Sequence, residues 1–152
     1  MNDNLISAKG LIEFNESDDI VSDLKNIIDL SQKQAYQAIN TALVYRNWLI
    51  GYRIAEEDRA EYGITLIRKL SKELTNEYGK GYTKTNLYSF YSFYKMYPNI
   101  FHSLSGKSAP LLSWTHYRTL IQVKDDKARN WYEKEAIEQT WSVRTLQRNI
   151  SS

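Results

Sequence analysis

The chain has 152 residues, of which 42% are hydrophobic and 25% are charged. These fractions are typical of a globular protein and exclude wholesale disorder. The absence of cysteine excludes disulfides, thiolate metal sites and thiol catalysis. No apolar run reaches the roughly 18 residues of a membrane span, and the N-terminus has no secretory signal pattern. We therefore expect a cytoplasmic protein with no membrane association, no structural metal and no cofactor.

Charge is distributed unevenly along the chain. The formal net charge is only +2, and residues 1–77 hold 13 acidic and 9 basic residues. Residues 78–124 hold six basic residues and no acidic residue, whereas residues 125–152 hold five of each. An acid-free stretch in so charged a chain indicates a surface for an anionic partner. A largely buried segment would also lack carboxylates, and both interpretations stay open at this point.

The N-terminal third predicts a long helix. Residues 1–16 show no sustained periodicity and are predicted to be a loose arm, whereas residues 17–152 are predicted to form a single helical domain. Ser17, Asp18 and Asp19 suit a helix N-terminus. Apolar residues at helical spacing then continue from Ile20 towards Glu56, which predicts one long helix or two abutting helices. Gly51 marks a kink or a close helix contact.

The remaining elements follow from cap and stop residues. A helix is predicted from Ile64 to Tyr78, where Gly79-Lys80-Gly81 ends it. Thr83 can cap the next helix, which Pro98 terminates, and residues 99–112 are predicted to be a loop. Three further helices are predicted to begin at the following caps: Ser113, Asp125 and Ser142. Because no segment shows convincing alternation and no Asn-Gly or Asp-Gly turn occurs, the predicted fold class is all-α.

Residues 64–97 form a helix-turn-helix-like unit with a glycine-bearing turn. On its second helix Lys84, Tyr88, Tyr91 and Lys95 share one stripe, because they are spaced by four, three and four residues. Ammonium groups can neutralise phosphates, and phenols can donate to phosphates or stack on bases. Helical pairs of this kind are often only packing corners, and tyrosines also fill helix–helix interfaces.

The predicted nucleic-acid-binding residues extend this stripe at both sides. Asn86 lies near the start of the second helix, where base-contacting side chains occur in recognition helices. The full set comprises Lys80, Lys84, Asn86, Tyr88, Tyr91, Lys95 and Arg118. We expect weak to moderate binding of DNA.

No catalytic or metal site is predicted. Glu133-Lys134-Glu135 lies in a predicted helix and is interpreted as surface ion pairs, and Glu56, Glu57, Asp58 and Glu61 as a solvated helix end. His116 has no acid nearby in sequence and is interpreted as a structural, hydrogen-bonded histidine rather than a general base. Five aromatic residues of the C-terminal part are expected to form one core: Trp114, Trp131, Trp141, Tyr117 and Tyr132.

Several short strings occur together in a specific order. They are Arg59-Ala60-Glu61-Tyr62-Gly63, Leu70-Ser71-Lys72-Glu73-Leu74, Tyr78-Gly79-Lys80-Gly81-Tyr82, Asn86-Leu87, Phe93-Tyr94, Tyr97-Pro98, Leu112-Ser113-Trp114-Thr115-His116-Tyr117, Ala128-Arg129, Trp131-Tyr132 and Trp141-Ser142-Val143-Arg144 with Leu146 and Arg148. This collinear set, from about Gln34 to Ser152, resembles the N-terminal domain of the bacterial YhcG-like family, a domain of unknown function.

The resemblance implies an all-helical, DNA-associated module. In that family the domain precedes a PD-(D/E)XK nuclease domain, which would begin after Ser152, so the chain itself is expected not to be an enzyme. The family pattern often carries arginines where this chain has Thr85, Ser89 and Ser92, which implies weak affinity or help from Arg118, Arg144 and Arg148. Arg144 has an alternative role in ion pairs with Asp125, Asp126 or Glu138.

A second interpretation of function also stays open. The predicted N-terminal helix is longer than a small domain needs, and it could form the seam of a homodimer. The chain would then be a helical dimerisation or protein-docking module that positions a downstream nuclease domain. The two interpretations are compatible, because a dimer would present paired units at a fixed spacing.

Overall fold

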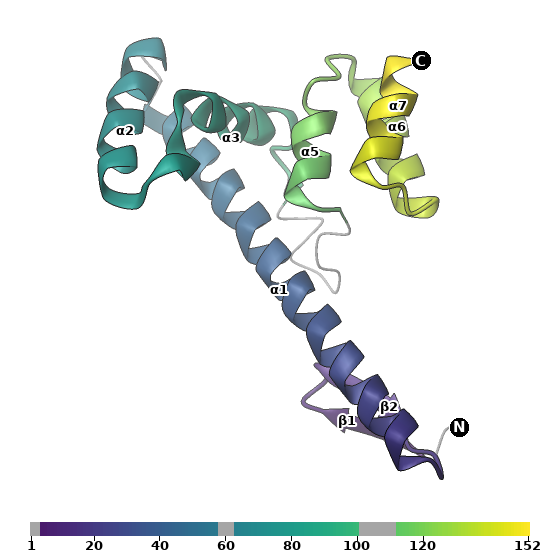
Figure 1. Cartoon of the computed structure of the whole chain (residues 1–152). Coiled ribbons are helices and arrows are strands. Elements are labelled where there is room, and N and C mark those ends of the chain that lie inside the picture. The colour runs from purple at the N-terminus through teal and green to yellow at the C-terminus, as the bar shows by residue number, and fades with distance from the viewer. Residues whose placement is uncertain (1–3, 58–62, 101–111) are drawn as a thin grey trace. The chain divides into compact units, whose positions relative to one another are not determined.

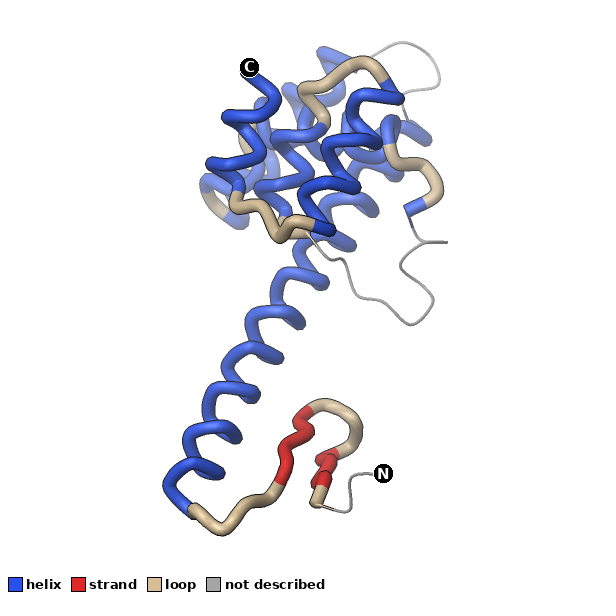
Figure 2. Tube along the Cα trace, turned by 90° about the vertical axis from the view of Figure 1, so that its right-hand side faces the viewer, coloured by secondary structure: helices blue, strands red, loops and turns tan. Residues whose placement is uncertain are grey.

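The computed structural model describes residues 4–57, 63–100 and 112–152, and it divides into two compact units, residues 1–42 and 43–152. Helices dominate, as the sequence predicts, and one small sheet accompanies them (Figures 1 and 2). The predicted division into an arm and a single helical domain stays a prediction. The loop predicted at 99–112 lies, for residues 101–111, outside the described part.

The first unit opens with a β-hairpin that the sequence analysis did not predict. Strands β1 (Leu5–Ala8) and β2 (Ile12–Asn15) pair antiparallel, with Leu5 opposite Asn15. The turn places Lys9 at φ 54° and Gly10 at φ 72°, and the Leu11 amide donates to the Ala8 carbonyl at 3.0 Å. Turns with a left-handed backbone at two successive residues usually contain Asn-Gly or Asp-Gly. Lys-Gly is a weaker signal, and each strand has only four residues.

Helix α1 (Ile20–Glu57) runs without interruption for 38 residues. The alternative of two abutting helices is therefore wrong. Asp19 caps its start, because its Oδ1 accepts the Val21 amide at 3.1 Å. The Ser17 hydroxyl donates to Asp23 at 2.7 Å, which fixes the chain that enters the helix. No proline lies within the helix, so nothing removes a backbone hydrogen bond along it.

The second unit contains the end of α1 and the remaining helices. These are α2 (Gly63–Tyr78), the 3₁₀ turn η2 (Lys80–Tyr82), α3 (Lys84–Met96), α5 (Trp114–Leu120), α6 (Asp126–Glu138) and α7 (Val143–Ser151). All four predicted caps are confirmed: the side chains of Thr83, Ser113, Asp125 and Ser142 each accept an amide in the first turn of the helix that follows. These bonds satisfy amides that have no partner within the helix.

Helix α3 contributes to two apolar clusters. Phe93 belongs to the larger cluster, whose other buried members are Val44, Trp48, Ile100, Leu112, Tyr117, Leu120, Ile121, Ala136 and Leu146. Leu87 and Phe90 join Ile54 and Ile67 in the smaller cluster. Trp114 packs against both clusters, and its ring lies 5.5 Å from Phe90 and 5.2 Å from Phe93. These contacts bury one side of α3 and leave its other side available for further contacts.

Helices α1 and α3 approach each other closely at Gly51. A Cβ atom at this position would overlap the carbonyl oxygen of Phe90 and lie 2.6 Å from its carbonyl carbon. Gly51 therefore permits a close helix contact, which is one of its two predicted roles. One turn earlier, the Trp48 indole N–H donates to the Tyr97 carbonyl at 2.9 Å. The end of α3 is thereby fastened to α1.

Four of the five aromatic residues expected to form one core, Trp114, Tyr117, Tyr132 and Trp141, belong to or pack against the larger cluster, and Trp131 does not. Tyr117 and Trp114 pack with the phenylalanines of α3, whereas Trp131 is 53% exposed and contacts Tyr132 and Trp141. Trp131 occupies a solvent-facing position of α6 that its type alone does not reveal. The expectation of a single aromatic core is wrong for this residue.

His116 has the structural role that the sequence analysis favoured. Its Nδ1 accepts the Ser113 backbone amide at 3.3 Å, while Ser113 Oγ accepts the His116 amide at 3.2 Å. Its Nε2 donates to the Trp141 carbonyl at 2.8 Å, because a carbonyl oxygen can only accept. The ring therefore completes the cap of α5 and ties that helix to the segment before α7.

Buried Arg129 organises a polar cluster in α6. The residue is only 3% exposed, its Nη1 donates to the Val123 carbonyl at 2.7 Å, and its Nη2 pairs with Asp126. The guanidinium lies 5.7 Å from the ring centroid of Tyr97. Asp126 is thus paired with Arg129, and Arg144 forms no ion pair with Asp125, Asp126 or Glu138. The ion-pair interpretation of Arg144 is wrong.

Glu133 also differs from its prediction as a surface ion pair. The carboxyl is largely withdrawn from solvent beside Tyr97 and Arg129. Burial raises its pKa, and the nearby Tyr97 hydroxyl and the charge of Arg129 oppose that rise. Neighbouring residues in a helix do not face each other, so Glu133 and Lys134 cannot pair on its surface. Glu133 instead lies beside Tyr97, at the end of α3.

Candidate nucleic-acid interface

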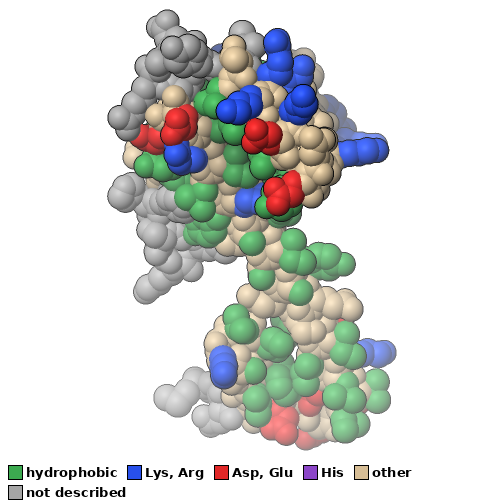
Figure 3. Space-filling model, turned by 90° about the vertical axis from the view of Figure 1, so that its left-hand side faces the viewer, with side chains coloured by type: hydrophobic (Ala, Val, Ile, Leu, Met, Phe, Trp, Pro, Cys, Tyr) green, Lys and Arg blue, Asp and Glu red, His purple; other side chains and the backbone are tan. Residues whose placement is uncertain are grey.

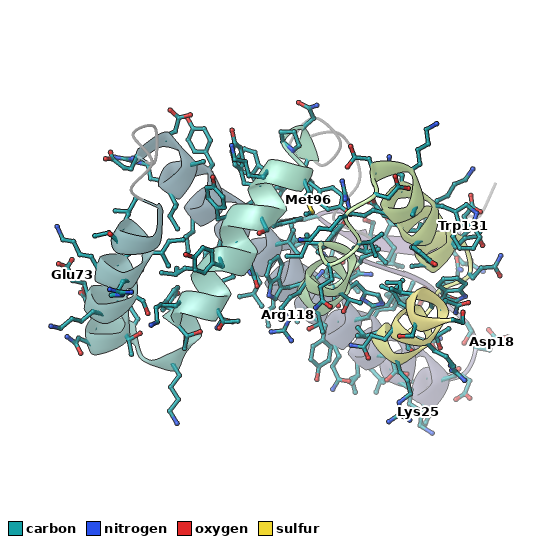
Figure 4. All side chains as sticks on the ribbon, turned by 90° about the horizontal axis from the view of Figure 1, so that it is seen from above. Asp18, Lys25, Glu73, Met96, Arg118 and Trp131 are labelled. Carbon is teal, nitrogen blue, oxygen red and sulfur yellow. The ribbon has the colours of Figure 1, made fainter. Side chains whose placement is uncertain are left out.

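A groove of about 580 Å³ lies between α3 and α5. Its α3 side consists of Thr85, Asn86, Tyr88, Ser89 and Ser92, and its α5 side consists of Arg118, Ile121, Gln122 and Lys124. Arg118 projects from α5 towards the side of α3 in the view from above (Figure 4). The groove is built entirely from residues of the acid-free stretch.

The composition of the groove suits an anion. Two cations and two amides meet a row of hydroxyls, and no carboxylate is present among its lining residues. Hydroxyl, amide and guanidinium groups are the donors that most often contact phosphate oxygens. Lys124 Nζ donates to the Ile121 carbonyl at 3.4 Å, which holds its stem along the groove while two further N–H bonds remain for a ligand.

Local geometry at the start of α3 places these side chains. Gly79 adopts φ 93°, which reverses the chain after α2, and η2 follows directly. Thr83 Oγ1 accepts the Asn86 amide at 3.2 Å, and the Asn86 side-chain amide donates to the Gly81 carbonyl at 3.1 Å. Asn86 therefore braces the turn with one N–H of its NH₂ group, and the second N–H remains for an anionic ligand.

The predicted Lys–Tyr stripe borders this groove. At about 100° per residue, Tyr88 lies between the stripe and the face that carries Thr85, Ser89 and Ser92. Tyr88 is 40% exposed and lines the groove. Lys84 is exposed at the first residue of α3. Of the stripe, Tyr88 is thus the residue that reaches the groove.

The other half of the stripe is engaged differently. Tyr91 is half-buried against the smaller apolar cluster, and Lys95 Nζ lies 5.7 Å from the centroid of its ring. Lys95 also lines a separate cavity of about 370 Å³ with Asp126 and Arg129. Lys80 is exposed on η2 and does not line the groove. These residues remain predicted rather than tested contacts.

The groove brings together residues that the sequence predicted and residues that it did not. Asn86, Tyr88 and Arg118 belong to the predicted set, whereas Gln122, Lys124 and the hydroxyls of Thr85, Ser89 and Ser92 do not. Lys124 carried a signal, since it closes the acid-free stretch. The hydroxyls carried none, because Ser and Thr in a helix are read only as weak helix formers.

Carboxylate clusters and histidine are the groups on which catalysis would draw. Within them, no group of three His, Asp or Glu side chains is placed to hold a metal ion. Both ring nitrogens of His116 are occupied by protein partners. Asp58 and Glu61 lie outside the described part. In the same ranges, no helix combines the length and apolarity needed to cross a membrane.

Comparisons with known proteins place the chain in a family. Residues 23–152 match the model of the DUF1016 N-terminal domain. A curated relative from Escherichia coli (strain K12), named "Putative nuclease YhcG", is 31% identical over 160 residues, which cover 84% of this chain and 42% of the relative. No solved structure matches. The chain spans less than half of that relative's length, and it belongs to the DUF1016 N-terminal domain family.

Proposed function

We propose that this chain is a non-catalytic nucleic-acid-binding module that serves a nuclease, and that it binds the phosphate backbone of DNA in the groove between α3 and α5. The observation that carries the proposal is the lining of that groove: Arg118, Lys124, Tyr88 and three hydroxyl side chains meet there without a carboxylate. The fixed side of α3 is occupied by the two apolar clusters. Its groove-facing side is therefore free for a ligand.

The groove favours backbone contacts over base readout. Two cations lie on its α5 side, and the hydroxyls of Thr85 and Ser92 lie on its α3 side, whereas the Ser89 hydroxyl donates to the Thr85 carbonyl at 3.1 Å. Short hydroxyl side chains and cations suit phosphate oxygens rather than the edges of stacked bases. With Arg118 and Lys124 as the groove cations, about two phosphates would be neutralised, so the slope of log K against log salt is expected to be roughly −2. Such binding is modest and largely independent of sequence.

The family relationship supports an accessory role. The relative is named a nuclease, and this chain covers 42% of it. A module that holds DNA without reading its sequence would raise the local concentration of substrate for a nuclease domain. We expect the chain alone to show no Mg²⁺-dependent cleavage of DNA.

A charge-reversal pair tests the groove. We expect Arg118→Glu with Lys124→Glu to weaken binding of a labelled DNA duplex at least tenfold, as measured by fluorescence anisotropy at low salt. The matched control is Lys69→Glu with Lys72→Glu, which makes the same charge change on the exposed face of α2. A groove variant that binds as well as the wild type, or a control that loses as much affinity, would contradict the proposal.

Two further variants separate the groove from the stripe. Thr85→Arg adds a cation at an exposed position of the groove, and we expect it to tighten binding several-fold. Lys84→Glu with Lys95→Glu reverses both ends of the predicted stripe. Loss of binding in that variant supports a contact that extends along α3, whereas unchanged binding confines the contact to the groove. Single-stranded DNA and RNA of equal length show whether the duplex is preferred.

A further inference from the structure

The first unit exposes an apolar face on the N-terminal half of α1. None of the described residues 4–42 is buried. The exposed fractions are 70% for Ile20, 56% for Val21, 51% for Leu24, 54% for Ile28 and 59% for Ile39. Figure 3 shows apolar side chains spread over this part of the surface. Apolar side chains that are this exposed are stabilised when another surface covers them.

These side chains form one continuous stripe. At about 100° per residue, ten residues between 20 and 42 fall within an arc roughly 120° wide. They are Ile20, Val21, Leu24, Ile27, Ile28, Ser31, Ala35, Ala38, Ile39 and Ala42. Every charged residue of this part of the helix lies outside the arc: Asp23, Lys25, Asp29 and Lys33. The stripe can therefore be covered without burying a charge.

The centre of the stripe follows a heptad pattern. Residues 21, 24, 28, 31, 35, 38 and 42 are separated alternately by three and four positions, which is the spacing of a two-helix seam. Over these three heptads the helix extends about 33 Å. We call these seven residues the α1 seam.

We propose that the α1 seam packs against the same seam of a second copy of this chain, with the two helices antiparallel. The seam is graded in size: Val21, Leu24 and Ile28 are large, Ser31 is central, and Ala35, Ala38 and Ala42 are small. An antiparallel two-fold axis near Ser31 places the large residues of each copy against the small residues of the other. Large and small residues then interdigitate at constant helix separation along the whole seam.

Charge favours the same orientation. Four acidic residues cluster towards the start of α1: Asp18, Asp19, Asp23 and Asp29. Parallel helices would bring the two acidic ends together, and like charges repel. Antiparallel helices move these ends apart and also align the helix dipoles in opposite directions, which is favourable. Size and charge thus select a second copy in antiparallel orientation.

Sedimentation velocity over a range of concentrations tests whether the dimer exists. We expect the chain to sediment as a dimer and Leu24→Glu with Ile28→Glu to sediment as a monomer. Ser22→Glu with Asn26→Glu is the matched control, because it adds the same charge at the same spacing on exposed residues outside the arc. Circular dichroism checks that each variant keeps its helix content. A monomeric wild type, or equal dissociation of both variants, would overturn the proposal.

Single cysteines test the orientation, since the chain has none of its own. In an antiparallel dimer Ser31→Cys, near the axis, forms an intermolecular disulfide on oxidation. Val21→Cys alone does not, but Val21→Cys mixed with Ala42→Cys does. Cross-linking of Val21→Cys to itself with equal efficiency would indicate parallel helices and refute the seam as proposed. The groove variants test the DNA proposal independently of the dimer, so a failure of either dimer test does not affect it.

Discussion

Gly51 of α1 lies against the backbone of Phe90 in α3, so closely that a methyl group at position 51 would overlap the Phe90 carbonyl oxygen. The obstructing atoms belong to backbone in the middle of a helix, which cannot rotate away as a flexible side chain can. This contact determines how near α3 lies to α1. It therefore also fixes the helix that carries one wall of the groove.

Gly51→Ala is expected to destabilise the protein. Alanine favours a helix over glycine by about 1 kcal/mol, but separating α1 from α3 disturbs both apolar clusters and costs about 1–3 kcal/mol or more. Thermal unfolding should show a clear fall in Tm. Gly81→Ala is the control, because a Cβ there meets nothing within 4 Å. An unchanged Tm for Gly51→Ala would mean that the helices separate freely.

Removal of the His116 ring should loosen the C-terminal helices. His116→Ala leaves the Trp141 carbonyl and the Ser113 amide without their partners, at a cost of about 1–3 kcal/mol for each group that stays buried. Thr115→Ala, at the exposed neighbour, is the control. We expect a lower Tm only for the first variant, with DNA affinity at low temperature unchanged. A loss of DNA affinity in a fully folded His116→Ala variant would assign this residue a direct role in binding.

Stability should fall in alkaline solution. Burial is the main cause that raises the pKa values of Tyr97 and Tyr117 above their usual range, and the charge of Glu133 raises both further. A group whose pKa is higher when folded contributes stability below its unfolded pKa, about 10 for tyrosine, and loses it as pH rises towards the folded value. The free energy of unfolding should therefore decline above about pH 10.

The tyrosine variants isolate this effect. Tyr117→Phe removes one buried phenol and should make the alkaline decline less steep, as measured by denaturant unfolding between pH 8 and pH 11 and by tyrosinate absorbance. Tyr36→Phe is the control, because Tyr36 is 75% exposed. Parallel curves for wild type and Tyr117→Phe would show that this phenol is not the group responsible.

Features that depend on neighbouring residues were predictable from the sequence. The caps at Thr83, Ser113 and Ser142 were found because a side-chain oxygen reaches an amide only three residues away. The hairpin at residues 5–15 was missed, because two four-residue strands around Lys-Gly carry little local signal. The sequence indicated a close helix contact at Gly51 as one possibility, but it did not indicate that the partner is the backbone of Phe90.

The sequence by itself determined the helical fold class, most helix starts, the acid-free stretch and membership of the family. Only the tertiary structure decided that Arg118 and Lys124, in α5 and the turn after it, meet Tyr88 and three hydroxyls of α3. It also decided that Lys95 lies over the ring of Tyr91 and that Arg129 is buried. The physical reason is the distance along the sequence over which each effect acts. Helix propensity and capping act over a few residues, whereas a groove forms where side chains far apart in sequence are brought together by apolar burial, which is not directional.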